Sequence, residues 1–284
     1  MRQSSRKMFS LNIVGCGHVG RVLARLFAQQ QLFKVQDILN RSQASSAAAL
    51  IFVGSGRALD AYEDLRHAKL WMLAVSDDQI LPVCDRLLAL GKLRAGDIVF
   101  HCSGALAAKQ LQTAQALGVH VASLHPVRSF ADPQAVLTQF AGTFVSMEGD
   151  AAALAVLQPA LQTLGAQTLI IDGEQKALYH AASVLACNYF TSLVDASLRT
   201  WQQAGIAPAT ARQLAEPLIR ETLDNIFRLG PAQALTGPLA RGDMQTVQKQ
   251  QQALQAWDGE IAALYQAFTN CSAQLVARKR AGQE

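Results

Sequence analysis

The chain reads Leu-Asn-Ile-Val-Gly-Cys-Gly-His-Val-Gly from Leu11 to Gly20, and this stretch decides the fold. An apolar run breaks into Gly15, Gly17 and Gly20, and a helical pattern follows over 21–30. In such a turn the first glycine permits a sharp exit from a strand, the second lets the backbone approach a pyrophosphate, and the third lets helix and strand pack closely. The stretch predicts a strand, a turn and a helix that bind a dinucleotide through Gly15, Cys16, Gly17, His18, Val19 and Gly20. A purely structural turn and an S-adenosylmethionine-type fold are the alternatives.

Length and composition set the class of protein. The 284 residues are 50% hydrophobic and only 16% charged, which indicates a globular chain with a large core. At about 100–200 residues per domain, the length allows a nucleotide-binding domain and a second unit. The net charge of +4 is scattered, with no basic run longer than that at 278–280. This distribution predicts mild attraction for small anions and no binding of nucleic acid.

The cysteines and the apolar runs indicate a cytoplasmic protein. The five cysteines lie far apart and form no C-x-x-C pair, so neither a disulfide framework nor a metal site is expected. Residues 1–7 are basic, but no apolar segment of secretory length follows them. No stretch reaches about 18 uninterrupted apolar residues, so no membrane span is expected.

The end of the second expected strand, 33–39, decides which nicotinamide cofactor fits. An NAD site places an acid there for the ribose 2′-hydroxyl, whereas an NADP site removes that charge and offers Arg. Asp37 is the only nearby acid and lies two residues before the strand ends. Asn40, Arg41 and Ser42 follow, and Arg41 with Ser42 is interpreted as the clamp for the 2′-phosphate of NADP. The alternative is a solvated Arg in a loop.

Further apolar runs, each separated by helical patterns, predict strands at 70–75, 97–101, 119–124, 143–147 and 168–171. This alternation is typical of a doubly wound α/β fold, a Rossmann sheet. The alternation of strand and helix patterns ends at Asp172, and only helical patterns follow. The sequence therefore predicts an NADP-binding Rossmann domain over 1–172 and an all-helical domain over 173–284, which would hold the substrate and dimerise.

Polar residues follow three of these strands at the edge where ligands of parallel sheets bind. The backbone of Val75, Ser76 and Asp77 is expected to pass close to the cofactor, and Asp77 with Asp78 would either contact it or cap the next helix. Ser103 could bond a substrate carboxylate or the cofactor carboxamide. His125 could polarise a carbonyl or stiffen the turn before Pro126.

The first helix of the second domain, 174–204, is expected to carry the chemistry. Its first half is apolar around most of its circumference, which favours a buried position or a homodimer interface. Lys176 and His180 are four residues apart and share a face, and Asn188 lies near that face. Such a polar stripe needs partners, which a substrate pocket would supply.

Reduction by NADPH needs a proton donor that works near neutral pH. His180 fits without help, whereas Lys176 would need its pKa lowered by burial. The alternatives are a solvated lysine and a hydrogen-bonded core histidine. Further along the chain, Asp243 is expected to cap a helix, and Arg241 would either pair locally or reach an anionic substrate in a neighbouring subunit.

Six motifs taken in order resemble one bacterial family: Gly15-Cys16-Gly17-His18-Val19-Gly20, Asn40-Arg41-Ser42, His101-Cys102-Ser103-Gly104-Ala105, Ser123-Leu124-His125-Pro126, Tyr179-His180-Ala181-Ala182 through Asn188, and Thr236-Gly237-Pro238 to Arg241-Gly242-Asp243. This Rossmann-like family carries a C-terminal domain of unknown function, DUF2520. Its fold is similar to those of pyrroline-5-carboxylate reductase, ketopantoate reductase and the 3-hydroxyacid dehydrogenases. The helical second domain, like that of 6-phosphogluconate dehydrogenase, often dimerises.

The resemblance implies an NADP-dependent oxidoreductase and leaves the substrate open. In the hydroxyacid dehydrogenases the matching helix carries Lys and, four residues on, Asn; here Lys176 matches and His180 replaces the Asn. Some members of the family are thought to be ketopantoate reductases. The expected function is therefore transfer of hydride between NADPH and a small anionic carbonyl or imine acid. A non-catalytic NADP sensor or scaffold is the rival hypothesis.

Overall fold

The computed structural model describes residues 8–282 and divides into two compact units, which meet between Cys187 and Asn188. The predicted boundary after Asp172 differs, because the first helix beyond it belongs to the unit that holds the sheet. The basic segment 1–7 lies outside the described residues. In the part of the chain that the structure describes, no helix is long and apolar enough to cross a membrane.

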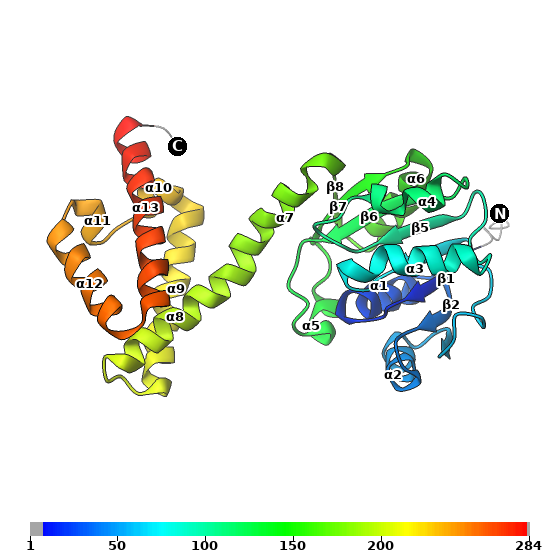
Figure 1. Ribbon diagram of the computed structural model, residues 1–284, viewed down its shortest axis with the longest axis horizontal. Helices are drawn as coiled ribbons and strands as arrows, with labels where there is room; N and C mark the ends of the chain where they lie inside the picture. Colours follow the sequence, from blue (N-terminus) through cyan, green and yellow to red (C-terminus); the bar gives the residue numbers. More distant parts are fainter. Residues whose placement is uncertain (1–7, 283–284) are drawn as a thin grey trace, which may run out of the picture. The chain divides into compact units, whose positions relative to one another are not determined.

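The first unit contains a sheet of eight strands within the described residues, in the order β3-β2-β1-β4-β5-β6-β7-β8 (Figure 1). Neighbouring strands are parallel except β6 and β7. The six strands whose bounds were predicted agree with the structure to within two residues at each end. The short β3 was not predicted. The strands are β1 Ser10–Val14, β2 Lys34–Leu39, β3 Arg57–Leu59, β4 Leu70–Leu73, β5 Ile98–His101, β6 His120–Pro126, β7 Phe144–Gly149 and β8 Gln167–Ile170.

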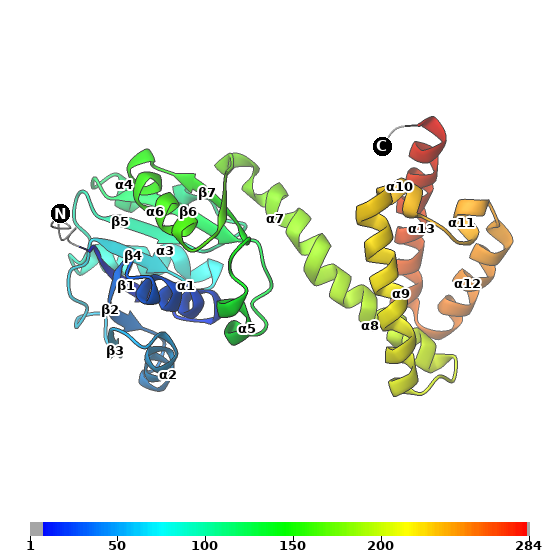
Figure 2. The same cartoon turned by 180° about the vertical axis from the view of Figure 1, so that it is seen from behind.

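Helices cover both faces of the sheet, and each face has its own apolar core. One core includes Leu23 and Phe27 of α1 with Leu157 of α6, and the other includes Ile80 and Leu87 of α3. Figure 2 shows the face that α1 and α6 cover. The helices of this unit before the second domain are α1 His18–Gln29, α2 Gln43–Val53, α3 Asp77–Ala89, the 3-10 turn η1 Ala108–Leu111, α4 Gln112–Gln115, α5 Pro133–Thr138 and α6 Ala151–Thr163.

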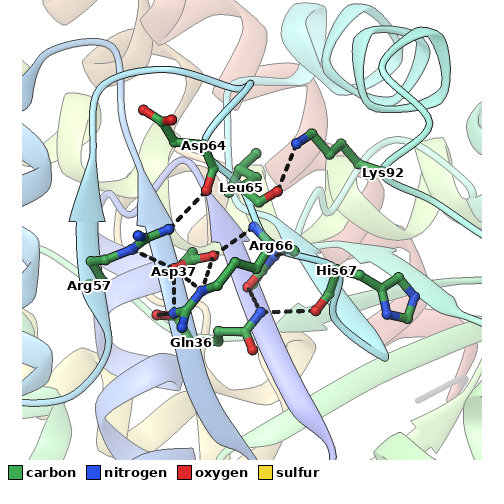
Figure 3. A network of polar contacts seen from close by, with 9 residues as sticks. Gln36, Asp37, Arg57, Asp64, Leu65, Arg66, His67 and Lys92 are labelled. Atoms are coloured by element: carbon green, nitrogen blue, oxygen red, sulfur yellow. Dashed lines mark hydrogen bonds and ion pairs between the residues drawn. The ribbon is translucent and has the colours of Figure 1, made fainter.

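Asp37 in β2 is buried and held by two arginines (Figure 3). Its carboxylate lies 2.7 Å from Nη2 of Arg66 and 3.2 Å from Nε of Arg57, and it accepts the backbone N–H of Arg66 at 2.9 Å. Burial alone would raise the pKa of Asp37, but the hydrogen bonds and charge of the arginines lower it. The carboxylate of Asp37 therefore serves to stabilise the fold, and it does not reach the tip of β2.

The chain then forms the 3-10 turn η2 Gly173–Gln175 and helix α7 Lys176–Val184, followed by a π-helical segment η3 Leu185–Tyr189 and helix α8 Phe190–Gln203. A single helix over 174–204 was predicted, so the π segment is a correction. The remaining helices are α9 Pro208–Leu229, which contains Pro217, α10 Pro231–Ala234, α11 Pro238–Arg241, α12 Met244–Trp257 and α13 Gly259–Ala281. Asp243 caps α12 as predicted, because its side chain accepts the N–H of Thr246 at 3.1 Å.

Candidate functional site

Two of the three glycines in the first turn are packed so closely that no side chain fits. Gly15 has φ +78°, and a Cβ on it would lie 2.4 Å from Cγ1 of Val75. A Cβ on Gly20 would lie 2.8 Å from Cβ of Ala74. The exit from β1 and the packing of α1 on the sheet thus require glycine at both positions.

Gly17 differs, because no atom lies within 4 Å of the position that its Cβ would take. It precedes α1, whose first turn has no side-chain cap and no acidic residue. The N–H groups at this helix start are therefore not capped by a side chain, and the positive end of the helix dipole faces the same space. An open glycine face next to uncapped N–H groups suits a phosphate.

Side chains predicted to contact the cofactor also hold the turn in place. The Cys16 N–H donates to Oδ1 of Asn40 at 2.5 Å, and the Asn40 amide donates to the carbonyl of Ser45 at 2.9 Å. Nδ1 of His18 lies 2.8 Å from the carbonyl oxygen of Phe130. Cys16 is buried, and burial raises its thiol pKa to about 12, so its thiol stays protonated.

The tip of β2 presents a free cation. Arg41 is exposed and makes no hydrogen bond or ion pair with any other residue between 8 and 282. Ser42 is the N-cap of α2, where its hydroxyl accepts the N–H of Ser45 at 3.3 Å. The structure therefore assigns Ser42 to the helix cap and leaves Arg41 available to a ligand.

At the end of β4, Ser76 is the residue before α3, and Asp77 and Asp78 form the first turn of that helix. Ser76 caps no backbone N–H. The pKa of Asp78 is lowered because its carboxylate accepts hydrogen bonds from the side chains of Ser76, which has the larger effect, and Gln79. Val75 packs against Gly15, so the β4 loop adjoins the glycine turn.

A row of polar side chains crosses three neighbouring strands. His101 of β5 is the register partner of Ser123 of β6, and Ser123 is the partner of Glu148 of β7. Lys176 of α7, only 1% exposed, donates from Nζ to Oγ of Ser123, and the same nitrogen lies 3.6 Å from Oε1 of Glu148. Burial lowers the pKa of Lys176, whereas the Glu148 carboxylate acts in the opposite direction.

This row anchors the loop after β5. The Ser103 N–H donates to Nδ1 of His101 at 3.2 Å, and the Ser123 hydroxyl donates to the Ser103 carbonyl at 3.3 Å. Oγ of Ser103 accepts the N–H groups of Ala105 and Leu106 at 3.1 and 2.9 Å. The predicted ligand-binding hydroxyl of Ser103 is thus engaged in the loop itself.

Two imidazoles lie over Gly104 in that loop. The rings of His125 and His180 are 5.4 Å apart and nearly perpendicular, at 80°. A Cβ on Gly104 would lie 2.8 Å from Nε2 of each ring and 2.3 Å from Cδ2 of His180. Nδ1 of His125 lies 3.3 Å from the hydroxyl of Tyr179. Burial first, and then the charges of His180 and Lys176, lower the pKa of His125 to about 4.

Lys176, His180, His125 and Ser103 thus come together, as their predicted roles require, within the first unit. Asn188 is an exposed residue of the π segment and belongs to the second unit. Sequence reasoning missed Glu148, because β7 runs antiparallel to β6 and its position beside Ser123 follows only from the register. Within residues 8–282 no three His, Cys, Asp or Glu side chains are placed to hold a metal ion.

Comparison with known proteins gives two family matches that together span most of the chain. A Rossmann-like domain matches residues 2–126, and the domain of unknown function DUF2520 matches residues 143–271. Comparison with the curated proteins found no match.

Several solved structures share the fold across both units. A protein from Thermotoga maritima is 26% identical with a TM-score of 0.72, covering 95% of this chain and 99% of its own. A protein from Bacteroides fragilis, proposed to be an NADP oxidoreductase, is 20% identical with a TM-score of 0.77, covering 94% and 98%. An imine reductase from Myxococcus stipitatus in complex with NADP+ is 16% identical with a TM-score of 0.63, covering 96% and 95%. The chain therefore consists of a Rossmann-like domain followed by a domain of the DUF2520 family.

Proposed function

We propose that the protein is an NADP-dependent oxidoreductase that acts on a small anionic carbonyl or imine acid. The observation that carries the proposal is the glycine turn, where Gly15 and Gly20 are packed and Gly17 is open beside the uncapped start of α1. Such a turn leaves room for a diphosphate at one place only, and it supplies N–H groups there.

The phosphorylated cofactor is favoured by the charges near β2. An NAD site needs an acid that accepts from the ribose 2′-hydroxyl. Asp37 is bound to Arg57 and Arg66 and is buried, so its carboxylate cannot serve. Arg41 instead offers an unpaired guanidinium next to the strand tip, where the 2′-phosphate of NADP would lie.

The cluster of Lys176, His125 and His180 suits an anionic substrate. When bound, the nicotinamide supplies a hydride, and the protein must supply binding, orientation and a proton. Lys176 contributes a buried positive charge, and His125 and His180 contribute two imidazoles beside it. A carboxylate would be attracted by the positive charge of Lys176 and by N–H donors of the neighbouring imidazoles.

The test is a binding measurement followed by a turnover screen. Calorimetry with NADPH should show a tight complex, and NADPH oxidation should then be followed with 2-oxo acids, ketopantoate and cyclic imine acids. Failure to bind NADPH would overturn the whole proposal. Binding without oxidation of any compound would instead support the sensor hypothesis.

We further propose that the exposed apolar face of α7 is covered by a second copy of the chain. Leu178 of α7 is 72% exposed, and Leu185, the first residue of the π segment that continues α7, is 63% exposed. Both lie in the helix 174–204 that the sequence predicts to be buried or at an interface. Exposed apolar side chains on one helix are typical of a protein–protein contact. The mass of the protein in solution tests this.

A further inference from the structure

One side chain of the glycine turn is bonded to a loop far away in the sequence. His18, the first residue of α1, has its Nδ1 2.8 Å from the carbonyl oxygen of Phe130. A carbonyl oxygen can only accept, so Nδ1 of His18 carries a proton and donates it in this bond. His18 is otherwise exposed, whereas Phe130 is buried. The residue predicted to contact the cofactor is therefore also the partner of the loop after β6.

This loop crosses the edge of the sheet where a dinucleotide is expected. β6 ends at Pro126, α1 begins beyond the end of β1, and β4 and β5 lie between these two strands. Three strand spacings amount to about 14 Å, and the chain from Pro126 to Phe130 spans at most about 14 Å. The loop is thus too short to go around this edge, and it passes along the ends of β5 and β4. Ligands of parallel sheets bind at these strand ends.

Both ends of the segment 127–132, which we call the strap, are fixed without the help of His18. At its start, the Val127 N–H donates to the carbonyl of Phe144 at 2.8 Å. At its end, Asp132 caps α5, and Figures 1 and 2 show α5 beside α1. Among residues 8–282, the bond from His18 is the one side-chain hydrogen bond that the backbone of the strap receives. A single hydrogen bond therefore holds the middle of the strap to the glycine turn.

We propose, on the basis of the oxidoreductase function proposed above, that the strap closes over the bound dinucleotide and that His18 is the positioning residue that holds it closed. The bond joins the turn that would hold the diphosphate to the segment that crosses the neighbouring strand ends. Because His18 is exposed, water can replace the carbonyl of Phe130, and the strap opens for the cofactor to enter or leave. Closure is favoured because Phe130 is buried in the core that it shares with α1.

This role of His18 has a kinetic signature that a direct contact with the cofactor lacks. The bond to Phe130 must break both when the dinucleotide enters and when it leaves. Loss of the bond therefore raises the association and dissociation rate constants by the same factor and leaves the dissociation constant unchanged. Loss of a direct contact instead raises mainly the dissociation rate constant and weakens affinity.

The first test measures the strap without cofactor. In His18→Ala, amide hydrogen exchange of residues 127–132, followed by mass spectrometry, should be about 2- to 10-fold faster than in the wild type, the effect of one hydrogen bond. His18→Asn is the conservative variant, because the Asn amide nitrogen takes the place of Nδ1 and still donates to Phe130. It should restore the wild-type exchange rate, and residues 98–101 of β5 should not change in either variant. Unchanged exchange of the strap in His18→Ala would overturn the inference.

The second test measures NADPH binding by stopped-flow fluorescence. For His18→Ala we expect both rate constants to rise by about 2- to 10-fold, with a dissociation constant within roughly a factor of two of the wild type. His18→Asn should restore both rate constants, although it has no Nε2 to offer to a phosphate.

Two results of this second test would contradict the inference in different ways. A rise in the dissociation rate constant alone, shared by His18→Ala and His18→Asn, would identify a direct contact with the cofactor. It would overturn this inference and leave the oxidoreductase function standing. Failure of the wild type to bind NADPH would overturn the proposed function, and with it the part of the strap in cofactor binding.

Discussion

Nζ of Lys176 lies 3.6 Å from Oε1 of Glu148, and the lysine of this pair is buried while the side chain of Glu148 is 12% exposed. The same ammonium bonds Oγ of Ser123, which in turn holds the carbonyl of Ser103. One buried cation thus connects the start of α7 to the loop that lies under both imidazoles.

Replacing the acid of this pair should weaken the folded state. Glu148→Gln retains the shape and the acceptor for the Ala108 N–H, which lies 2.6 Å from Oε1, but it removes the charge that offsets burial of Lys176. We expect a loss of about 1–3 kcal/mol of unfolding free energy and a lower pKa of Lys176, measured by urea titration and by the ¹³Cε shift. Glu174→Gln, which breaks the exposed pair with Lys109, is the control and should change neither value. Equal effects of both variants would contradict the expectation.

The stability of the protein should fall in mild acid because of His101. Burial, and to a lesser extent Lys176, lowers its pKa to about 4 from 6.5. Between pH 6.5 and 4, His101 is protonated in the unfolded chain but neutral in the folded chain. The full free energy of unfolding is therefore present above pH 6.5 and declines as the pH falls toward 4. The decline attributable to this residue is about 3 kcal/mol. The free energy of unfolding, measured by urea titration, should fall less between pH 7 and pH 4.5 for His101→Asn than for the wild type. An identical fall in both proteins would refute the assignment to His101.

Removal of the cation at the tip of β2 should change the preference between cofactors. A charge-assisted hydrogen bond contributes about 1.5–3 kcal/mol, which corresponds to roughly 10- to 100-fold in affinity. Arg41→Ala should weaken NADPH binding by that factor and spare NADH in calorimetry. Lys34→Ala removes an exposed charge from the other end of β2 and should affect neither cofactor. Equal weakening of both cofactors by Arg41→Ala would be inconsistent with a 2′-phosphate contact.

A methyl group at position 104 should separate the imidazoles. In Gly104→Ala the new Cβ would lie 2.3 Å from Cδ2 of His180, so the ring must move by about an ångström. Displacements of that size lower turnover by roughly 100-fold. Steady-state kinetics should show this loss in kcat, while NADPH affinity stays unchanged. Gly259→Ala, whose Cβ meets nothing closer than 3.6 Å, is the control. An unchanged kcat in Gly104→Ala would remove the loop from the reaction.

A charge on α7 should alter the mass of the particle if that helix lies between two copies. Leu178→Lys places an ammonium on a side chain that is 72% exposed in the single chain. We expect light scattering to report a dimer for the wild type and a monomer for the variant, since burying an unpaired charge is costly. Ile51→Lys, at a position on α2 that is 83% exposed, should remain a dimer. A wild-type monomer would exclude the proposal.

The sheet was largely predictable because each of its inner strands is buried on both faces and reads as an unbroken apolar run, as Leu70 to Leu73 does. The three-residue β3 carries no such signal and was missed. The reversal of β7 was missed as well, since a strand pattern does not encode direction. Glu148 therefore could not be placed next to Lys176 from the sequence, although the motifs that contain Ser123, His125 and His180 could be found. The π segment after α7, which contains Asn188, carries no sequence pattern of its own.

Asp37 and Asn40 also determine how difficult it would be to change the cofactor specificity of this protein from NADP to NAD. The carboxylate already present in β2, that of Asp37, is paired with the guanidinium groups of Arg57 and Arg66. A new acid would have to replace Asn40, whose amide joins the Cys16 N–H to the carbonyl of Ser45. A carboxylate can keep the first of these bonds and must lose the second, because it has no N–H to donate. Exchange of one dinucleotide for the other would therefore demand a rebuilt second loop as well as a single altered charge.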